Sequence, residues 1–354
     1  MKVHLAILES DEAYLRRIVS VFTQKYADKL EVYSFTNESS AMRELTDAKI
    51  DVLLASDVFE IDTKQIPSRC GFAYLVDSPD VEMMYGAEAV CRFQKAELIY
   101  KRILNIFSEK TAAVTGINPQ DGQGARTIAF ISAAGGTGCS TAAAACAIHF
   151  SRKGKKVLYL NLEQFGSADV FFQGEGQGKL EDIIYAIKSK KGNLYLKLES
   201  TVKQDETGVF FFSAASVALD RMELQEEEIR QILVELRTYC GYDYMILDFD
   251  FSMQPGQLEL LKECSQIVLV ADGREASNRK TERMLDSLSI LEQQKDIKLL
   301  MRMGILYNRF GSRISQELNG RELRKYGGIK RYEGYRISQL LQELAALEVF
   351  DAMA

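Results

Sequence analysis

The sequence predicts an α/β protein built from two doubly wound domains, and three observations lead to this prediction. Apolar runs typical of buried strands alternate with amphipathic runs typical of helices along most of the 354 residues. Residues 108–126 show little hydrophobic periodicity, which predicts a linker between domains of residues 1–107 and 127–354. The composition, with 47% hydrophobic and 27% charged residues, is that of an ordinary globular protein.

The first domain is predicted to contain five strands interleaved with helices, the order of a small doubly wound sheet. Asp11 and Glu12 open the first helix, whose apolar residues fall on one face. The predicted strands are residues 2–8, 30–35, 50–55, 72–76 and 89–93, and further helices are predicted at 39–45 and 97–107.

The order of these elements resembles that of response-regulator receiver domains, which have a flavodoxin-like fold. Such domains carry an acidic pair after the first strand, a phosphoacceptor aspartate ending the third, and a lysine after the fifth. Glu9 and Asp11 follow the first predicted strand, and Arg92 is the best match for the lysine. Ser56 aligns with the acceptor, however, and Asp57 comes one residue late, which turns its side chain to the other face. We therefore expect a receiver-like domain that is not phosphorylated and serves as a docking surface.

The second domain opens with a strand, a glycine-rich turn and a helix. An apolar run at residues 127–131 leads into the turn, and an alanine-rich run at 141–150 follows it. Backbone N–H groups of such a turn converge beside the positive end of the helix dipole and form an anion cradle, typically for a phosphate chain. A turn that binds nothing is the alternative interpretation. The turn contains Ala134, Gly135, Gly136, Thr137, Gly138, Cys139, Ser140 and Thr141.

The rest of this domain continues the alternation of strands and helices. Further strands are predicted at residues 157–162, 209–212, 242–248, 266–271 and 303–307, and helices at 179–188, 224–239, 277–293 and 337–350.

Polar residues follow three of these strands. Asn161 and Glu163 lie at one strand end, and Asp248 ends an apolar strand in the pattern of a carboxylate that orders the water shell of magnesium. Asn308 and Arg309 end another. The amide of an asparagine suits a purine edge, although an asparagine that caps a turn is the alternative.

These motifs resemble those of the MinD and ParA ATPases, and the whole chain resembles the two-domain pilus-assembly proteins TadZ and CpaE. The resemblance rests on G-G-T-G-C-S-T, Y-L-N-L-E-Q, Y-D-Y-M-I-L-D, Y-N-R-F and K-R-Y-E-G. It implies a dimeric, ATP-binding protein that marks where a Flp-type pilus secretion machine assembles. It implies contacts with ATP by Gly135, Gly136, Thr137, Gly138, Cys139, Ser140, Thr141, Asn308, Arg309 and Lys330, and with Mg²⁺, directly or through water, by Ser140, Glu163 and Asp248.

The chain departs from the MinD and ParA pattern where charge is needed for hydrolysis. Ala134 and Cys139 replace two lysines of the loop, one of which stabilises charge on the transferred phosphoryl group. Asn161 and Glu163 replace a pair of aspartates, and an asparagine cannot act as a base. We therefore assign no catalytic residue and expect slow or absent ATP hydrolysis. Because Cys139 begins a helix, a lowered pKa of its thiol is a further hypothesis beside that of a small residue leaving room for phosphate.

Two other functions remain open. A working partitioning or positioning ATPase would need another cation in place of the lysines, for which Arg274, Arg279 and Lys280 are candidates. A phosphorelay response regulator would need phosphoacceptor chemistry at Ser56 or Asp57.

Composition limits the partners. The net charge of −6 argues against nucleic acid, and six scattered cysteines with two histidines argue against a zinc site or disulfide framework. We found no apolar run near the roughly 20 residues of a membrane span, and the final predicted helix lacks the basic face of a membrane anchor. We expect a cytoplasmic homodimer, at a cell pole or at the inner-membrane pilus machine, whose receiver-like domain contacts pilus secretion proteins.

Overall fold

The computed structural model describes residues 2–47, 49–110, 124–190, 192–295, 297–311, 314–318 and 322–354. Its contacts divide the chain into two compact units: unit 1 comprises residues 1–118 and 185–201, and unit 2 comprises residues 119–184 and 202–354. Most of the predicted linker, residues 111–123, lies outside the described residues. At its two ends, helix α3 (Ala96–Lys110) continues to residue 110 and strand β7 (Arg126–Ile131) begins at residue 126.

Unit 1 is built on a six-stranded sheet with the strand order β2-β1-β3-β4-β6-β5. Its first five strands in that order pair in parallel, and only β5 and β6 pair as an antiparallel hairpin. The five predicted strands are therefore present, with one short edge strand added. The strands are β1 (Val3–Leu8), β2 (Leu30–Phe35), β3 (Val52–Ser56), β4 (Gly71–Val76), β5 (Met83–Met84) and β6 (Ala87–Cys91), and the other elements before α3 are α1 (Glu12–Lys25), α2 (Glu38–Asp47) and η1 (Thr63–Gln65).

A segment from the middle of the chain completes unit 1. Helix α7 (Leu194–Thr201), which was not predicted, packs against α3. The Tyr100 hydroxyl of α3 donates a hydrogen bond to Glu199, with 3.1 Å between Oη and Oε1, and Lys197 Nζ donates to Asn105 at 2.6 Å. The sequence places residues 185–201 in the second domain, whereas their contacts place them with the first.

Unit 2 is built on an eight-stranded sheet in the order β14-β13-β12-β7-β11-β8-β10-β9, in which only β9 and β10 are antiparallel. This sheet and the sheet of unit 1 confirm the predicted fold class. The strands after β7 are β8 (Val157–Asn161), β9 (Lys203–Gln204), β10 (Phe210–Phe211), β11 (Tyr244–Asp248), β12 (Gln266–Ala271), β13 (Met303–Phe310) and β14 (Arg324–Lys330).

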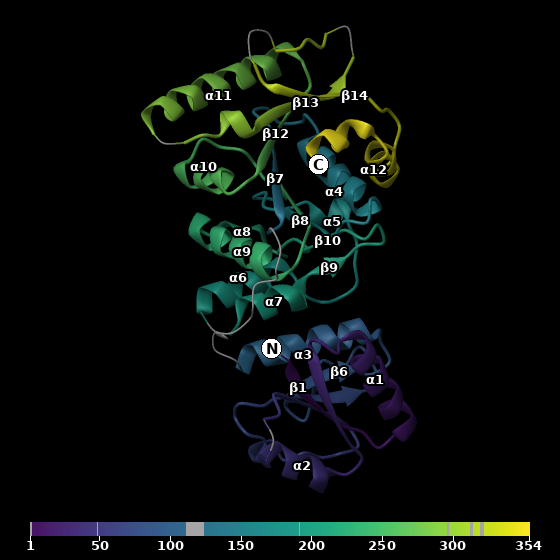
Figure 1. The fold of residues 1–354 in the computed structure, drawn as a ribbon. Coiled ribbons are helices and arrows are strands. Elements are labelled where there is room, and N and C mark those ends of the chain that lie inside the picture. Colours follow the sequence, from purple (N-terminus) through teal and green to yellow (C-terminus); the bar gives the residue numbers. More distant parts are fainter. Residues whose placement is uncertain are drawn as a thin grey trace. The chain divides into compact units, whose positions relative to one another are not determined.

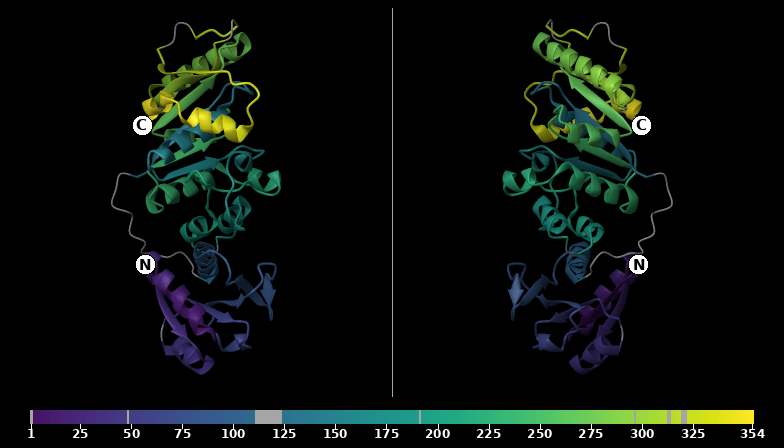
Figure 2. Two further views of the ribbon diagram at one scale, coloured as in Figure 1. Left: turned by 90° about the vertical axis from the view of Figure 1, so that its right-hand side faces the viewer. Right: turned by 90° about the vertical axis from the view of Figure 1, so that its left-hand side faces the viewer.

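Helices cover both faces of this sheet. Figures 1 and 2 show α4 and α12 on one face and α9, α10 and α11 on the other. The predicted final helix is shorter than expected, since α12 ends at Ala345 and a 3-10 helix follows. The helices are α4 (Cys139–Arg152), α5 (Ala168–Phe171), α6 (Leu180–Ser189), α8 (Ala218–Met222), α9 (Glu226–Tyr239), α10 (Pro255–Lys262), α11 (Glu275–Gln294) and α12 (Ile337–Ala345), with 3-10 turns η2 (Leu300–Arg302) and η3 (Glu348–Met353).

Strand β7 and helix α4 place the phosphate-loop motif at the carboxyl edge of the sheet. Ile128 and Phe130, two residues apart on β7, share a core with the buried alanine run of α4. The neighbouring strands end in register, because Asp248 of β11 pairs with Asn161 of β8 and with Phe130 of β7. The polar residues at the ends of β8 and β11 are thereby brought side by side, next to the strand that leads into the loop.

Candidate functional site

The glycine-rich turn joins β7 to α4 as a loop with an open side. Gly136 and Gly138 have φ angles of +76° and +80°, which L side chains rarely adopt, and Gly138 caps α4. A Cβ added at Gly135 or Gly136 would meet no atom within 4 Å. The backbone of the turn is therefore uncovered at Gly135 and Gly136, and its use as an anion cradle stays a prediction.

Hydroxyl groups brace the loop from inside. Thr137 is buried, and its Oγ1 donates to Ser132 Oγ at 3.0 Å. Ser132 Oγ lies 2.8 Å from the carbonyl oxygen of Val270 on β12 and 2.9 Å from that of Ala134. The side chain of Thr137 is thus engaged in the loop itself.

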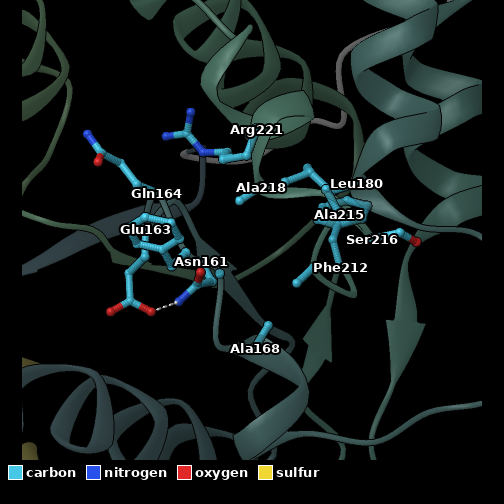
Figure 3. A pocket seen from close by; sticks show the side chains of 13 residues that line it. Asn161, Glu163, Gln164, Ala168, Leu180, Phe212, Ala215, Ser216, Ala218 and Arg221 are labelled. Carbon is cyan, nitrogen blue, oxygen red and sulfur yellow. Dashed lines mark hydrogen bonds between the residues drawn. The ribbon is translucent and has the colours of Figure 1, made fainter.

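A cluster of polar side chains adjoins the first turn of α4. Ser140 Oγ donates to Glu163 Oε1 at 3.1 Å, and Asn161 Nδ2 donates to Glu163 Oε2 at 2.8 Å, the bond drawn in Figure 3. Asn161 Nδ2 also lies 3.1 Å from Asp248 Oδ2, which accepts a second bond from the Tyr159 hydroxyl at 2.7 Å. The structure therefore brings together the three predicted magnesium contacts, Ser140, Glu163 and Asp248. The part of Tyr159 in this cluster was not predicted, because a tyrosine within an apolar strand pattern is expected to serve the core.

Burial makes this cluster electrostatically unusual. Asp248 is only 1% exposed, and burial raises the pKa of its carboxyl to about 7, although the hydrogen bond from Tyr159 acts in the opposite direction. Burial also raises the pKa of the Cys139 thiol well above its ordinary value, and the charges of Asp248 and Glu163 add to the effect. The hypothesis of a lowered thiol pKa at this helix start is therefore wrong, because desolvation and carboxylates outweigh the helix dipole.

Asn308 and Arg309, at the end of β13, contact the loop directly. Asn308 Nδ2 donates to the Thr137 carbonyl oxygen at 2.8 Å, and Arg309 Nη1 donates to that of Gly136 at 2.8 Å. The other end of the Asn308 amide accepts from the Arg309 backbone N–H at 3.0 Å. In this arrangement Asn308 holds the turn, which is the alternative interpretation of that residue, and its contact with adenine stays a prediction.

A cavity of about 530 Å³ opens beside these residues. It brings four of the predicted nucleotide contacts together: Thr141, Asn308, Arg309 and Lys330. Residues 331–334 and two leucines of α12 complete its lining. Its volume falls within the roughly 300–1,000 Å³ of small-molecule sites.

Two of the three candidate replacement cations, Arg274 and Arg279, lie in ion pairs of their own. Arg274 contacts Asp272, with 2.5 Å between Nη2 and Oδ2, and Arg279 contacts Glu282 at 3.3 Å. Neither lines the cavity beside Asn308 and Arg309. Arg309 is instead the arginine that touches the loop, and it follows the predicted asparagine directly.

The described residues contain no group of three His, Cys, Asp or Glu side chains that could hold a metal by themselves. Glu163 and Asp248 form a smaller set. Magnesium usually keeps several waters and is bound through one or two carboxylates together with substrate phosphates, so this donor set suits that ion.

In unit 1 the positions that correspond to receiver chemistry are occupied by an ion-pair network. Glu9 is fully buried, accepts the Asp11 backbone N–H at 3.0 Å, and pairs with Arg92 at 3.0 Å. Arg92 also pairs with Asp77. Ser56 is buried at the acceptor position, 3.5 Å from the carboxylate of Asp57. Glu9 and Arg92, which the sequence matches to an acidic position and to the lysine of receiver domains, are therefore in contact.

None of the helices in the described ranges is long and apolar enough to cross a membrane.

Comparisons with known proteins agree with this architecture. Residues 1–108 match the family described as TadZ-like, receiver domain, and residues 128–345 match the CobQ/CobB/MinD/ParA nucleotide binding domain. The structure is similar in fold to a ParA family ATPase from Chlorobium tepidum, which has 21% identity and a TM-score of 0.52 and covers 65% of this chain and 96% of that one. Comparison with curated proteins gave no match.

Two further solved structures are similar at lower scores. MinD from Pyrococcus horikoshii, complexed with Mg-ADP, has 16% identity and a TM-score of 0.47, covering 62% of this chain and 94% of that one. Cobyrinic acid a,c-diamide synthase from Mycobacterium smegmatis, with a bound ATP analogue and magnesium, has 15% identity and a TM-score of 0.46, covering 62% and 92%.

Proposed function

Since the chain belongs to the CobQ/CobB/MinD/ParA nucleotide-binding family and begins with a TadZ-like receiver domain, we propose that it is a localisation or assembly factor for a Flp (Tad) pilus secretion system. It binds ATP, acts as a homodimer and hydrolyses ATP slowly or not at all. It works in the cytoplasm, at a cell pole or at the inner-membrane pilus machine.

One observation carries this proposal: an open phosphate cradle adjoins a carboxylate cluster, and the lysines of the loop are missing. The backbone of Gly135 and Gly136 is uncovered, and Ser140 links the loop to Glu163. Backbone N–H groups and the dipole of α4 favour a polyphosphate without a side-chain cation. The nucleotide base would lie in the cavity beside Asn308, Arg309 and Lys330.

Magnesium fits the cluster because a buried carboxylate there lacks a cationic partner among the described residues. Asp248 accepts bonds from Tyr159 and Asn161, which are neutral. Magnesium, when bound, would neutralise the phosphate oxygens. Asp248 and Glu163 would orient its waters, and Ser140 would contact it directly or through one of those waters.

Slow hydrolysis is expected because the loop lacks its two lysines and Asn161 replaces an acid. Ala134 and Cys139 offer no cation to stabilise charge on the transferred phosphoryl group. Asn161 offers an amide where a base would be needed. Arg309 contacts a carbonyl oxygen of the loop, so turnover would require it to leave that bond. ATP would therefore act as a structural ligand that orders the dimer.

The receiver-like domain is proposed as the docking surface for pilus secretion proteins. Glu9 is already neutralised by Arg92, and the buried Ser56 replaces the aspartate that would accept a phosphoryl group. This arrangement supports docking over phosphorelay. The proposal includes no nucleic acid partner and no direct membrane anchor.

Calorimetry with Mg-ATP, together with ADP release measured over hours, tests the proposal. We expect micromolar binding without product. Binding with steady turnover would favour a partitioning ATPase, and absence of binding would leave the domain a scaffold. Purification of the chain with Tad pilus proteins from a native host would test the partner, and failure to recover any of them would contradict the proposed role.

A further inference from the structure

A second cavity lies on the far side of Glu163 from the phosphate loop. It has a volume of about 250 Å³ and is formed by the end of β8, the loop after it, α5, the start of α6, the segment after β10, and α8. Its apolar lining includes the buried side chains of Ala168, Leu180 and Phe212. Because the cavity is smaller than the roughly 300–1,000 Å³ of sites for drug-sized ligands, it suits a single side chain better than a cofactor.

Arg221 supplies the positive charge at this cavity. One of its guanidinium nitrogens, Nη2, donates to the Leu162 carbonyl oxygen at 2.7 Å. Its Nε is buried and has no hydrogen-bond partner within the described parts of the chain. A buried donor left unsatisfied costs about 1–3 kcal/mol, so an acceptor brought by a ligand would recover that energy.

The carboxylate that lines the cavity does not serve as that acceptor. Glu163 accepts bonds from Ser140 and Asn161, and Figure 3 shows its carboxylate turned toward Asn161 and away from Arg221. Burial lowers the pKa of the Arg221 guanidinium, and the charge of Asp250 acts against this effect. The cavity therefore combines an apolar lining with an arginine that forms no ion pair with a carboxylate among the described residues.

The rim of the cavity is apolar and exposed. Phe165 lines the cavity and is nevertheless 74% exposed. Leu219 and Met222 are also exposed, and they adjoin the lining residues Ala218 and Arg221 in the sequence of α8. Exposed large apolar residues around a partly desolvated arginine are the composition of a protein-binding hot spot. A polyphosphate would gain nothing from such a rim.

We propose that this cavity binds a segment of a partner protein that presents an apolar side chain beside a carboxylate. The apolar side chain enters over Phe212 and Leu180, and the carboxylate accepts charge-assisted hydrogen bonds from Arg221. Phe165 then becomes buried against the partner. This inference does not depend on nucleotide binding. Glu163 lines this cavity and also contacts Ser140 of the phosphate loop. Partner binding and nucleotide binding would therefore involve the same side chain.

N-acetyl-leucine and its neutral amide are matched probes that differ in the carboxylate. In the full-length, deuterated, ¹⁵N-labelled protein, we expect N-acetyl-leucine to shift the Arg221 Nε–Hε signal and the backbone amides of residues 214–218. A ligand this small should bind with a dissociation constant of roughly millimolar size. The amide should bind at least fivefold more weakly.

Arg221→Gln should remove the preference for the carboxylate. Arg230→Gln should leave it unchanged, because Arg230 is an exposed arginine of α9 paired with Glu227. In case Arg221→Gln disturbs the Leu162 contact, Ala218→Leu fills the cavity while keeping the arginine and should abolish binding of both probes. Backbone spectra of each variant show whether it is folded.

Equal affinity for acid and amide, or an unchanged preference in Arg221→Gln, would overturn the proposal. So would probe shifts that gather away from residues 214–218. Sedimentation of the same variants distinguishes another occupant: if Ala218→Leu weakens self-association of the chain, the cavity is filled by a second copy and the proposed partner segment is wrong.

Discussion

Ser140, in the first turn of α4, donates a hydrogen bond to Glu163, with 3.1 Å between Oγ and Oε1. This bond connects the glycine-rich loop to the acid that follows β8. A magnesium ion bound between phosphate and acid would replace the bond, because hydroxyl and carboxylate oxygens are both magnesium ligands. The contact therefore marks the position where ion and loop would meet.

Glu163→Gln should weaken binding of Mg-ATP by about tenfold, or about 1.4 kcal/mol. The amide keeps the shape of the side chain and removes the charge that would hold the ion's waters. Calorimetry with magnesium measures this loss. ATP affinity in EDTA should not change, and Glu206→Gln, an exposed glutamate of unit 2, is the matched control. Equal loss with and without magnesium would show that Glu163 supports the loop rather than the ion.

Asp248→Asn should alter the pH dependence of unit 2 stability. The pKa of this carboxyl is about 7 in the folded protein, against an ordinary value of 3.8, so the folded state retains a proton that the unfolded state loses. Stability without ligand therefore falls as pH rises from about 4 to 7 and levels off above, by at most about 1.4 kcal/mol per pH unit. The asparagine variant carries no such proton and should lack this fall.

Hydrogen exchange of peptides from β11 measures that difference in the absence of nucleotide. The stability of Asp248→Asn minus that of the natural protein should be larger at pH 8 than at pH 5 by about 1 kcal/mol or more. Asp250→Asn, at an exposed carboxyl two residues along the chain, is the control. A difference that stays constant with pH would contradict the burial argument.

Alanine substitutions at two glycines of the loop should have different effects, one on ATP affinity and the other on stability. At Gly135 an added Cβ meets nothing within 4 Å, so Gly135→Ala should change the stability of unit 2 by less than about 0.5 kcal/mol. The methyl group would occupy the open side of the cradle and reduce ATP affinity at least tenfold. Calorimetry and hydrogen exchange of α4 peptides separate the two effects, and unaltered ATP binding would show that the cradle lies elsewhere.

At Gly138 the φ angle of +80° strains any L side chain, and an added Cβ would lie 2.4 Å from Asn308 Nδ2. Gly138→Ala should therefore destabilise the loop and α4 by about 2 kcal/mol. Faster hydrogen exchange in β13 peptides, where Asn308 lies, should accompany the loss. If exchange in α4 is unchanged, the contact between Gly138 and Asn308 is not tight in solution.

Removing Arg92 should destabilise unit 1. Glu9 is fully buried, and in Arg92→Met its carboxylate would keep only neutral hydrogen-bond donors. The free energy of unfolding should therefore fall by about 3 kcal/mol. Adding Glu9→Gln to the same chain should restore part of that loss, because no buried charge then remains. Hydrogen exchange of β1 peptides measures both variants. An Arg92→Met protein as stable as its parent would mean that the ion pair contributes little.

The sequence was most informative where apolar runs form central strands. The runs that end at Ile131, Asp248 and Ala271 became β7, β11 and β12, because a strand buried on both faces has few alternatives. Polar residues at the ends of parallel strands could be predicted to lie close together, since such strands share the carboxyl edge of a sheet. Register alone placed Asp248 beside Asn161.

Elements that depend on tertiary contacts could not be predicted in this way. In α7, leucines at 194, 196 and 198 alternate with a period of two, which suggests a strand, yet packing against α3 makes it a helix. Strand β14 contains Gly327 and Gly328 and buries only Tyr326 and Ile329, so it lacks an apolar run. Arg221 is one of 44 basic residues, and only folding reveals its unpaired Nε.

The insertion of residues 185–201 into unit 1 changes how the two parts are joined. The chain passes between the units at 118–119, at 184–185 and again at 201–202. A single proteolytic cut in the predicted linker would therefore divide unit 1 between two polypeptides, which would still be held together by the contacts of α7 with α3. A fragment ending before α7 would lack the helix that covers α3, including the Glu199 contact with Tyr100. The receiver-like part is thus not a detachable module, and a recombinant fragment of it must carry α7 to keep its full core.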